Sequence, residues 1–231
     1  IGCEVSYNGQ ITPSSNRVNC TPGINPSPRM HGIRFGSSTA AKCMITQTTD
    51  RYEWTTYSTF SVWIKPFNYK QDNYIAYRNK DDATWHQRIY VSSSTRRLIW
   101  FDGYDSSTEY INLTSASEIP LNQWTHVVLT ANDQGCRMWI NGIQEAFKEY
   151  QSTDYMWYDG TGAAISQQSR HAKIGGPEDE VGAGNDLYMS EMYFLPSRYF
   201  TAETFGKFFD YGWGPLDYET VLDNIKKVQE T

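Results

Sequence analysis

Residues 59–66 read TFSVWIKP, and this stretch decides the fold class. Its apolar residues Phe60, Val62 and Ile64 occupy alternate positions, the period of two that is expected of a β-strand with one buried face. Pro66 lacks the backbone N–H that a strand ladder needs, and therefore ends the strand. The stretch predicts an antiparallel strand with one face in a core.

The same pattern recurs along the chain at near-regular spacing. Asn141-Gly142 supplies the pair of residues that a tight hairpin turn needs between two of the runs. A chain of 231 residues suits one all-β domain. Many short strands separated by turns predict a two-sheet antiparallel jelly-roll sandwich over residues 31–213. Besides 59–66, the expected strands are 74–78, 87–92, 98–101, 110–113, 124–130, 136–140, 143–147, 171–175 and 187–195.

The two ends of the chain differ from this pattern. Residues 1–30 hold four of the nine prolines, interleaved with Asn and Ser, and predict an extended arm with little regular structure. Residues 214–231 predict a helical tail, with Asp217 as its N-cap and apolar residues at helical spacing from Val221 to Val228. The capping pattern at Thr201 predicts a second short helix over Thr201–Phe209. We expect the arm and the terminal helix to contact other subunits.

Four motifs in order give the chain a family resemblance. The segments 60–66 (FSVWIKP), 122–128 (NQWTHVV), 138–142 (MWING) and 171–175 (HAKIG) resemble the recurring strands of the laminin-G-like, concanavalin-like lectin superfamily. The closing segments 187–194 and 200–206 are similar to virion proteins of marine bacteriophages. The resemblance implies a virion structural protein in a tail fibre, spike or head decoration, located in the virion. Its partners would be copies of itself, other virion proteins and host surface glycans.

Composition excludes two classes of partner. The formal net charge is -6 and no basic run occurs, so the electrostatic footprint of a nucleic-acid-binding protein is missing. No apolar stretch approaches 18 residues, which argues against membrane insertion.

The sequence does not predict an enzyme. Retaining glycosidases need two carboxyl groups about 5–5.5 Å apart. The enzymes of the resembled superfamily carry them on one strand in a Glu-x-Asp-x-Glu type of run, and no Glu-x-Asp occurs in the chain. Glu178-Asp179-Glu180 has a different order and lies in a Gly-rich loop. We therefore assign no catalytic residues and expect no required cofactor.

Calcium is a possible ligand on two sets of acidic and amide residues. The resemblance implies Ca²⁺ in a rim loop, where hard oxygen ligands hold it. The same side chains are also common as solvated turn residues. The two sets are Asp179, Glu180, Asn185 and Asp186 in one loop, and Asp102 and Asp105 in another.

Aromatic side chains are the candidate glycan or subunit contacts, since rings serve both kinds of binding. The long loop 148–170 carries Tyr155, Trp157 and Tyr158, and long loops in compact domains are often functional. Trp85, Trp100 and Tyr104 are further candidates, although the two tryptophans could equally face the core as strand residues.

The cysteines separate two alternatives. Cys3, Cys20, Cys43 and Cys136 allow three pairings and have no metal-site spacing. Cytosolic assembly of a virion would keep them reduced, whereas a secreted, extracellular adhesion module or filament subunit would pair them. In that second interpretation the sequons at Asn19 and Asn112 would carry glycans.

Overall fold

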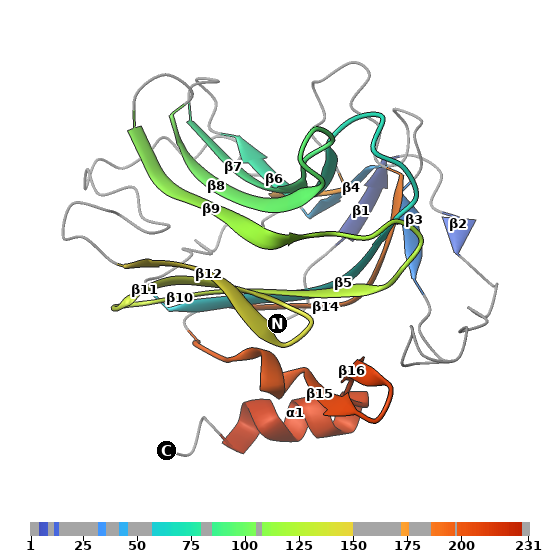
Figure 1. Ribbon diagram of the computed structural model, residues 1–231, viewed down its shortest axis with the longest axis vertical. Coiled ribbons are helices and arrows are strands. Elements are labelled where there is room, and N and C mark those ends of the chain that lie inside the picture. Colours follow the sequence, from blue (N-terminus) through green and yellow to red (C-terminus); the bar gives the residue numbers. More distant parts are fainter. Residues whose placement is uncertain are drawn as a thin grey trace.

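The computed structural model describes residues 5–8, 12–13, 32–35, 42–45, 57–79, 85–104, 108–149, 172–175, 186–196 and 198–227. Two antiparallel seven-stranded sheets lie face to face as a sandwich, as the sequence predicted (Figure 1). Sheet A has the order β1-β4-β13-β6-β7-β8-β9 and sheet B the order β12-β11-β10-β5-β14-β3-β2. In sheet A, the strands are β1 (Val5–Asn8), β4 (Lys42–Ile45), β13 (Ala172–Ile174), β6 (Asn73–Asn79), β7 (Trp85–Val91), β8 (Arg97–Tyr104) and β9 (Thr108–Glu118).

Sheet B contains the strand that includes residues 59–66. That strand, β5, lies between β10 and β14. The strands of sheet B are β12 (Ile143–Glu149), β11 (Gly135–Ile140), β10 (Thr125–Asn132), β5 (Ser58–Pro66), β14 (Leu187–Pro196), β3 (Ile33–Phe35) and β2 (Thr12–Pro13). Asn141-Gly142 forms the tight turn between β11 and β12, with φ of 49° and 80°.

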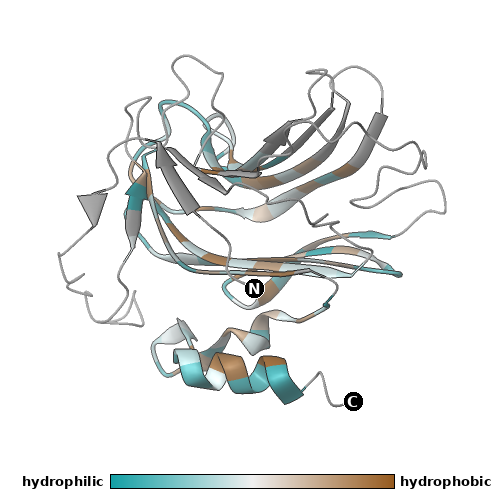
Figure 2. Ribbon diagram, turned by 180° about the vertical axis from the view of Figure 1, so that it is seen from behind, coloured by the Kyte–Doolittle hydropathy of each residue, from teal (hydrophilic) through white to brown (hydrophobic). Residues whose placement is uncertain are grey.

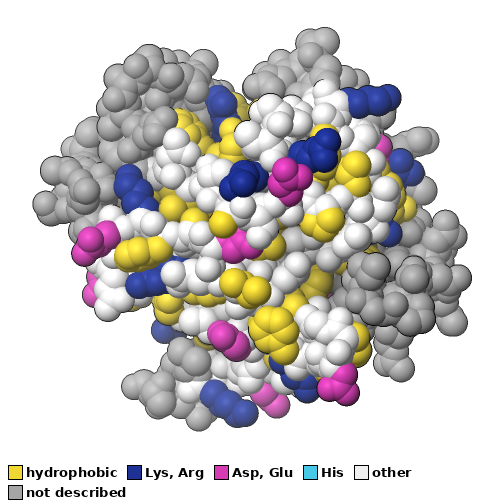
Figure 3. Space-filling view, in the orientation of Figure 1, with side chains coloured by type: hydrophobic (Ala, Val, Ile, Leu, Met, Phe, Trp, Pro, Cys, Tyr) yellow, Lys and Arg dark blue, Asp and Glu magenta, His cyan; other side chains and the backbone are white. Residues whose placement is uncertain are grey.

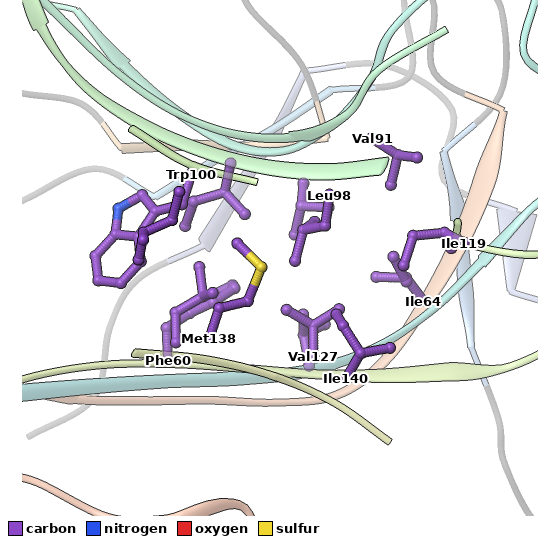
Figure 4. Packing of buried hydrophobic residues seen from close by; sticks show 14 of the residues in the cluster. Phe60, Ile64, Val91, Leu98, Trp100, Ile119, Val127, Met138 and Ile140 are labelled. Carbon is purple, nitrogen blue, oxygen red and sulfur yellow. The ribbon is translucent and has the colours of Figure 1, made fainter. Parts of the chain in front are cut away.

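The main core fills the space between the sheets. The alternation in β5 places Phe60, Val62 and Ile64 there, each at most 3% exposed. Sheet A contributes Leu98 and Trp100, which Figure 4 shows between the two layers. Burial of such side chains stabilises the fold by roughly 1.5–3 kcal/mol each.

A second hydrophobic cluster lies on the outer face of sheet B. Residues 198–227, here called the cap, cover this face with the 3₁₀ helix η1 (Ala202–Thr204), the hairpin β15 (Gly206–Phe209) and β16 (Gly212–Pro215), and the helix α1 (Tyr218–Lys227) (Figure 1). The cluster consists of Trp63, Trp124, Val128, Trp139, Phe200, Ala202, Phe205, Trp213 and Val221.

The terminal helix is confirmed, and its apolar side is turned inward. Asp217 caps it, because its carboxylate accepts the Thr220 N–H at 3.0 Å. Val221 is 1% exposed within the cap cluster and Ile225 packs beside it. Figure 2 shows the hydrophobic positions of α1 on one side of an otherwise hydrophilic helix. The apolar stripe predicted from the sequence therefore binds the chain's own sheet.

The helix expected over Thr201–Phe209 is wrong. Helical structure ends at Thr204, and β15 follows in antiparallel pairing with β16. Thr201 makes no side-chain capping hydrogen bond. Gly206 lies against the indole of Trp213, where a Cβ would come within 2.7 Å of the ring. Close packing of backbone and indole, rather than local helix propensity, sets the conformation here.

The arm is not wholly without regular structure. β1 extends sheet A by pairing with β4, and β2 extends sheet B by pairing with β3. The exposed backbone groups of an edge strand bind any compatible extended segment, a choice that local sequence does not encode. The boundary expected between residues 213 and 214 falls inside β16.

Candidate functional site

The outer face of sheet A is concave, because β7, β8 and β9 curve away from sheet B (Figure 1). Ladder pairing defines which side chains share this face. Tyr77 lies opposite Arg88, Arg88 opposite Phe101, and Phe101 opposite Asn112. A second row runs alongside, in which Tyr74 lies opposite Tyr90. We call these six residues the concave-face site.

Aromatic rings form the base of the concave-face site. Tyr74 stacks on Tyr90 at 5.3 Å between ring centroids and meets Tyr77 edge-on at 6.0 Å. Tyr74 and Tyr77 are 6% and 5% exposed, whereas Tyr90 and Phe101 are half-buried. Rings held in edge and stacked contacts cannot rotate freely, so their faces are fixed before a ligand arrives.

Polar groups accompany the rings on the same rows. The guanidinium carbon of Arg88 lies 6.0 Å from the centroid of Phe101, and Asn112 is exposed at the end of the row. Burial raises the pKa of Tyr90, Asp72 raises it further and Arg88 opposes the change. The Tyr90 phenol is therefore protonated at neutral pH and able to donate a hydrogen bond. The face combines ring surfaces with guanidinium, amide and hydroxyl groups.

A buried Ser–His pair under the cap resembles a catalytic arrangement, but the imidazole carries its proton on the wrong nitrogen for catalysis. The Trp213 Nε1–H donates to His126 Nδ1 at 3.0 Å. Burial lowers the pKa of His126 to about 3, so the ring is neutral and its one N–H lies on Nε2. Nε2 therefore donates to Ser61 Oγ, 2.9 Å away. A histidine that donates to the serine cannot take the serine's proton, and the pair is structural.

Asp186, one of the residues predicted to bind calcium, is held in structural contacts. Both oxygens of Asp186 accept hydrogen bonds, one from Arg34 at 3.0 Å and the other from Asn68 at 2.7 Å. A guanidinium beside the carboxylate opposes binding of a cation there, contrary to the calcium prediction for this residue. In the part of the chain that the structure describes, no three His, Cys, Asp or Glu side chains group as for a metal.

The remaining predicted site residues divide into three groups. Trp100 is fully buried in the sandwich core (Figure 4), so its prediction as a glycan contact is wrong and the core alternative holds. Trp85 and Tyr104 lie opposite each other in the ladder of β7 and β8, and Asp102 belongs to β8 rather than to a loop. Outside the described residues lie Tyr155, Trp157, Tyr158, Asp105, Asp179, Glu180 and Asn185.

Of the predicted aromatic contacts, Trp100 is corrected by the structure, while Tyr155, Trp157 and Tyr158 stay predictions because they lie outside the described residues. In residues 98–101 every position is apolar, so alternation gives no sign of which ones face the core. Arg88 carried a signal that could have been used, because a charged residue between buried strand positions points to the outer face. Its ladder partners Tyr77 and Phe101 follow only from the register.

The two packed seven-stranded antiparallel sheets form a lectin-like sandwich. The chain belongs to the concanavalin A-like lectin/glucanases superfamily, whose laminin-G family model matches residues 38–176, more than half of the chain. A search of the curated proteins finds no matching relative. Within the described residues, no helix is both long and apolar enough to cross a membrane.

Solved structures share this fold at low identity. Domain 4 of AbnA, a GH43 extracellular arabinanase from Geobacillus stearothermophilus in complex with arabinotriose, has a TM-score of 0.56 and 11% identity, over 96% of this chain and 86% of that one. The botulinum neurotoxin serotype G binding domain has a TM-score of 0.58 and 11% identity, over 100% and 47%. A botulinum neurotoxin type C structure, from work on cell entry dependent on two ganglioside molecules, has 0.53 and 18%, over 99% and 47%. The chain thus spans about half of the neurotoxin chains.

Proposed function

We propose that the chain is a non-enzymatic glycan-binding module that holds its ligand on the concave-face site. The observation that carries the proposal is the row Tyr77, Arg88, Phe101 and Asn112 across three strands and the edge strand of sheet A. Sugars place their C–H faces on aromatic rings while guanidinium and amide groups bind their hydroxyls. The arabinotriose complex of the arabinanase domain supports this class of ligand.

Binding to a glycan panel tests the proposal, with Phe101→Ala as the perturbed variant. Removing a half-buried ring from the centre of a contact costs about 1–3 kcal/mol, so we expect the Kd for the best glycan to rise about 5- to 150-fold. Phe208→Ala is the matched control, since Phe208 is an exposed ring in the cap. Equal binding by both variants would contradict the concave-face assignment. Loss of binding in EDTA would show that calcium takes part.

The context that we propose is a virion, where the module would serve in particle assembly, host attachment or both. The support is the resemblance of segments 187–194 and 200–206 to phage virion proteins. These segments form β14 and the start of the cap. Detection of this chain's peptides by mass spectrometry in purified virus particles is the expected result, and their absence from every particle fraction would contradict it.

The competing candidate is a secreted adhesion module, and the state of one residue distinguishes it from the virion protein. Asn112 is exposed on the concave-face site, and Thr114, which completes its sequon, is exposed two residues further along β9. An N-linked glycan at Asn112 would cover the row that we assign to the ligand. Mass spectrometry without reducing agent distinguishes the two: unmodified Asn112 and free thiols support the virion context, whereas glycosylation and paired cysteines support the secreted one.

A further inference from the structure

A second row of side chains lies on the outer face of sheet B, where it borders the cap. In the ladder, Tyr188 of β14 lies opposite Arg34 of β3 on one side and opposite Lys65 of β5 on the other. Side chains directly opposite each other share a face of the sheet. Tyr188 also contacts Trp124 of the cap cluster, with 6.3 Å between ring centroids. The row therefore places one cation on each side of the Tyr188 ring.

Phe67 completes this group, and we call Arg34, Lys65, Phe67 and Tyr188 the basic–aromatic site. Phe67 meets Tyr188 edge-on at 5.1 Å. The Arg34 guanidinium carbon lies 5.0 Å and the Lys65 Nζ 5.8 Å from the centroid of the Phe67 ring. Two cations beside one half-buried ring repel each other unless anions neutralise them.

Among the described side chains, one anion faces these two cations. Asp186 pairs with Arg34 at 3.0 Å, and its second oxygen is taken by Asn68. Among the described side chains, no carboxylate lies within ion-pair distance of Lys65. Counting the described side chains alone, Lys65 therefore adds one positive charge beside the half-buried rings of Phe67 and Tyr188, in a chain whose formal charge is -6. The side chain of Arg34 is 47% exposed, so the guanidinium is also accessible.

We propose that the basic–aromatic site binds an anionic sugar, a uronate or a sulfate ester, as a second glycan subsite. The rings of Phe67 and Tyr188 receive the apolar face of the sugar, and Lys65 pairs with its acidic group. Arg34, which is already held in position by Asp186, adds a second donor. The inference rests on the proposed class of ligand but uses a different face of the molecule from the concave-face site.

The test is calorimetric titration of the full chain with four probes. Oligogalacturonate is paired with its methyl ester, and a sulfated galactan oligosaccharide with its desulfated form, so that one member of each pair lacks the negative charge. Lys65→Gln should raise the Kd for the charged probe about tenfold or more, as expected for the loss of one charge-assisted contact. The matched control Lys70→Gln removes the same charge from an exposed position nearby and should leave the Kd unchanged.

Each outcome decides between the two sites. Tight binding of a charged probe that is weakened by Lys65→Gln and not by Phe101→Ala supports the basic–aromatic site, and the better of the two charged probes identifies the acidic group. Charged probes that bind no better than their neutral partners, or equal losses in the Lys65 and Lys70 variants, overturn it. If neutral glycans bind and lose affinity in Phe101→Ala, while no charged probe binds better than its neutral partner, this inference is overturned and the proposed function stands. Failure of every probe and every glycan would overturn both.

Discussion

Trp213→Ala should strongly destabilise the packing of the cap on sheet B. The indole is 8% exposed, stacks on His126 at 6.0 Å and lies against the backbone of Gly142 and Gly206. Truncating a buried Trp to Ala costs about 3–5 kcal/mol. The same change leaves His126 Nδ1 buried without its donor, so we expect the upper half of that range.

Urea unfolding followed by circular dichroism measures this loss as a change in the free energy of unfolding. Trp213→Phe keeps a ring but removes the N–H, and should cost about 1–3 kcal/mol. Phe208→Ala is the control within the same hairpin, because Phe208 is 62% exposed and should cost less than about 1 kcal/mol. If Trp213→Ala costs no more than Phe208→Ala, the cap is not held by its indole and the reasoning is refuted.

Three further predictions concern the same region. Burial raises the pKa of Glu191 to about 7 in the folded protein, above the ordinary 4.5, so the folded state binds the proton more tightly than the unfolded state. The stability that this proton contributes is fully present below pH 4.5 and should be lost as the pH rises through 7. The urea midpoint of the wild type should therefore fall over this pH range, and that of Glu191→Gln should not. If the midpoint of Glu191→Gln falls just as much, other groups cause the pH dependence. Gly142→Ala should be markedly destabilising in thermal melts, because φ is +80° and a Cβ would lie 2.2 Å from the Trp213 ring. In the control Gly212→Ala, φ is +111° and nothing lies within 4 Å of the Cβ, so only backbone strain destabilises the variant. Equal melting temperatures would show that the Trp213 ring moves aside without cost. Asp217→Ala should lower helicity in far-ultraviolet circular dichroism and Asp217→Asn should preserve most of it, since an amide oxygen also caps; equal loss in both would favour a role for charge over the cap.

Glu191 owes its position to a β-bulge in β14. The register shifts between Ser190 and Tyr193, and Glu191 has a φ of 48°, a region that non-glycine residues rarely occupy. The pKa of Tyr193 is raised to about 12, first by burial and then by the nearby Glu191 and Tyr218. The bulge thus holds an acid beside two phenols where sheet B meets the cap.

The strands were predictable because one face of each is buried. In β5 the burial of Phe60, Val62 and Ile64 forces a period of two that any local reading detects. The opposite face of the same strand carries Ser61 and Trp63, which are also buried, but under the cap. Local periodicity shows that a face is apolar without showing what covers it.

The candidate site was predictable only in part, because it depends on register. Trp100 and Phe101 are adjacent rings of similar chemistry, yet one is fully buried and the other lies on the concave face. Which of them faces the core depends on how β8 pairs with β7 and β9, a long-range property. The row formed by Tyr77, Arg88 and Phe101 joins three strands whose pairing no local pattern specifies.

The surface of the described residues mixes charges of both signs. On the face in Figure 3, Lys and Arg side chains stand among Asp and Glu, with hydrophobic side chains between them, including over the cap. No broad area of one sign is visible on this face, in keeping with the absence of a basic run in the sequence. On this face, recognition would therefore depend on local groups rather than on a broad field of one sign.

The order of the chain gives the cap a role during synthesis. Sheet B contains strands that are complete before the ribosome reaches residue 198, so the indoles of Trp63 and Trp139 on its outer face are made well before Trp213, which covers that face. A nascent chain at that stage presents an apolar surface to solvent, and such surfaces recruit chaperones or associate with one another. The cap, residues 198–227, covers that surface once it has been made. Any shortened product that ends before them should accumulate as aggregate rather than as a smaller working sandwich.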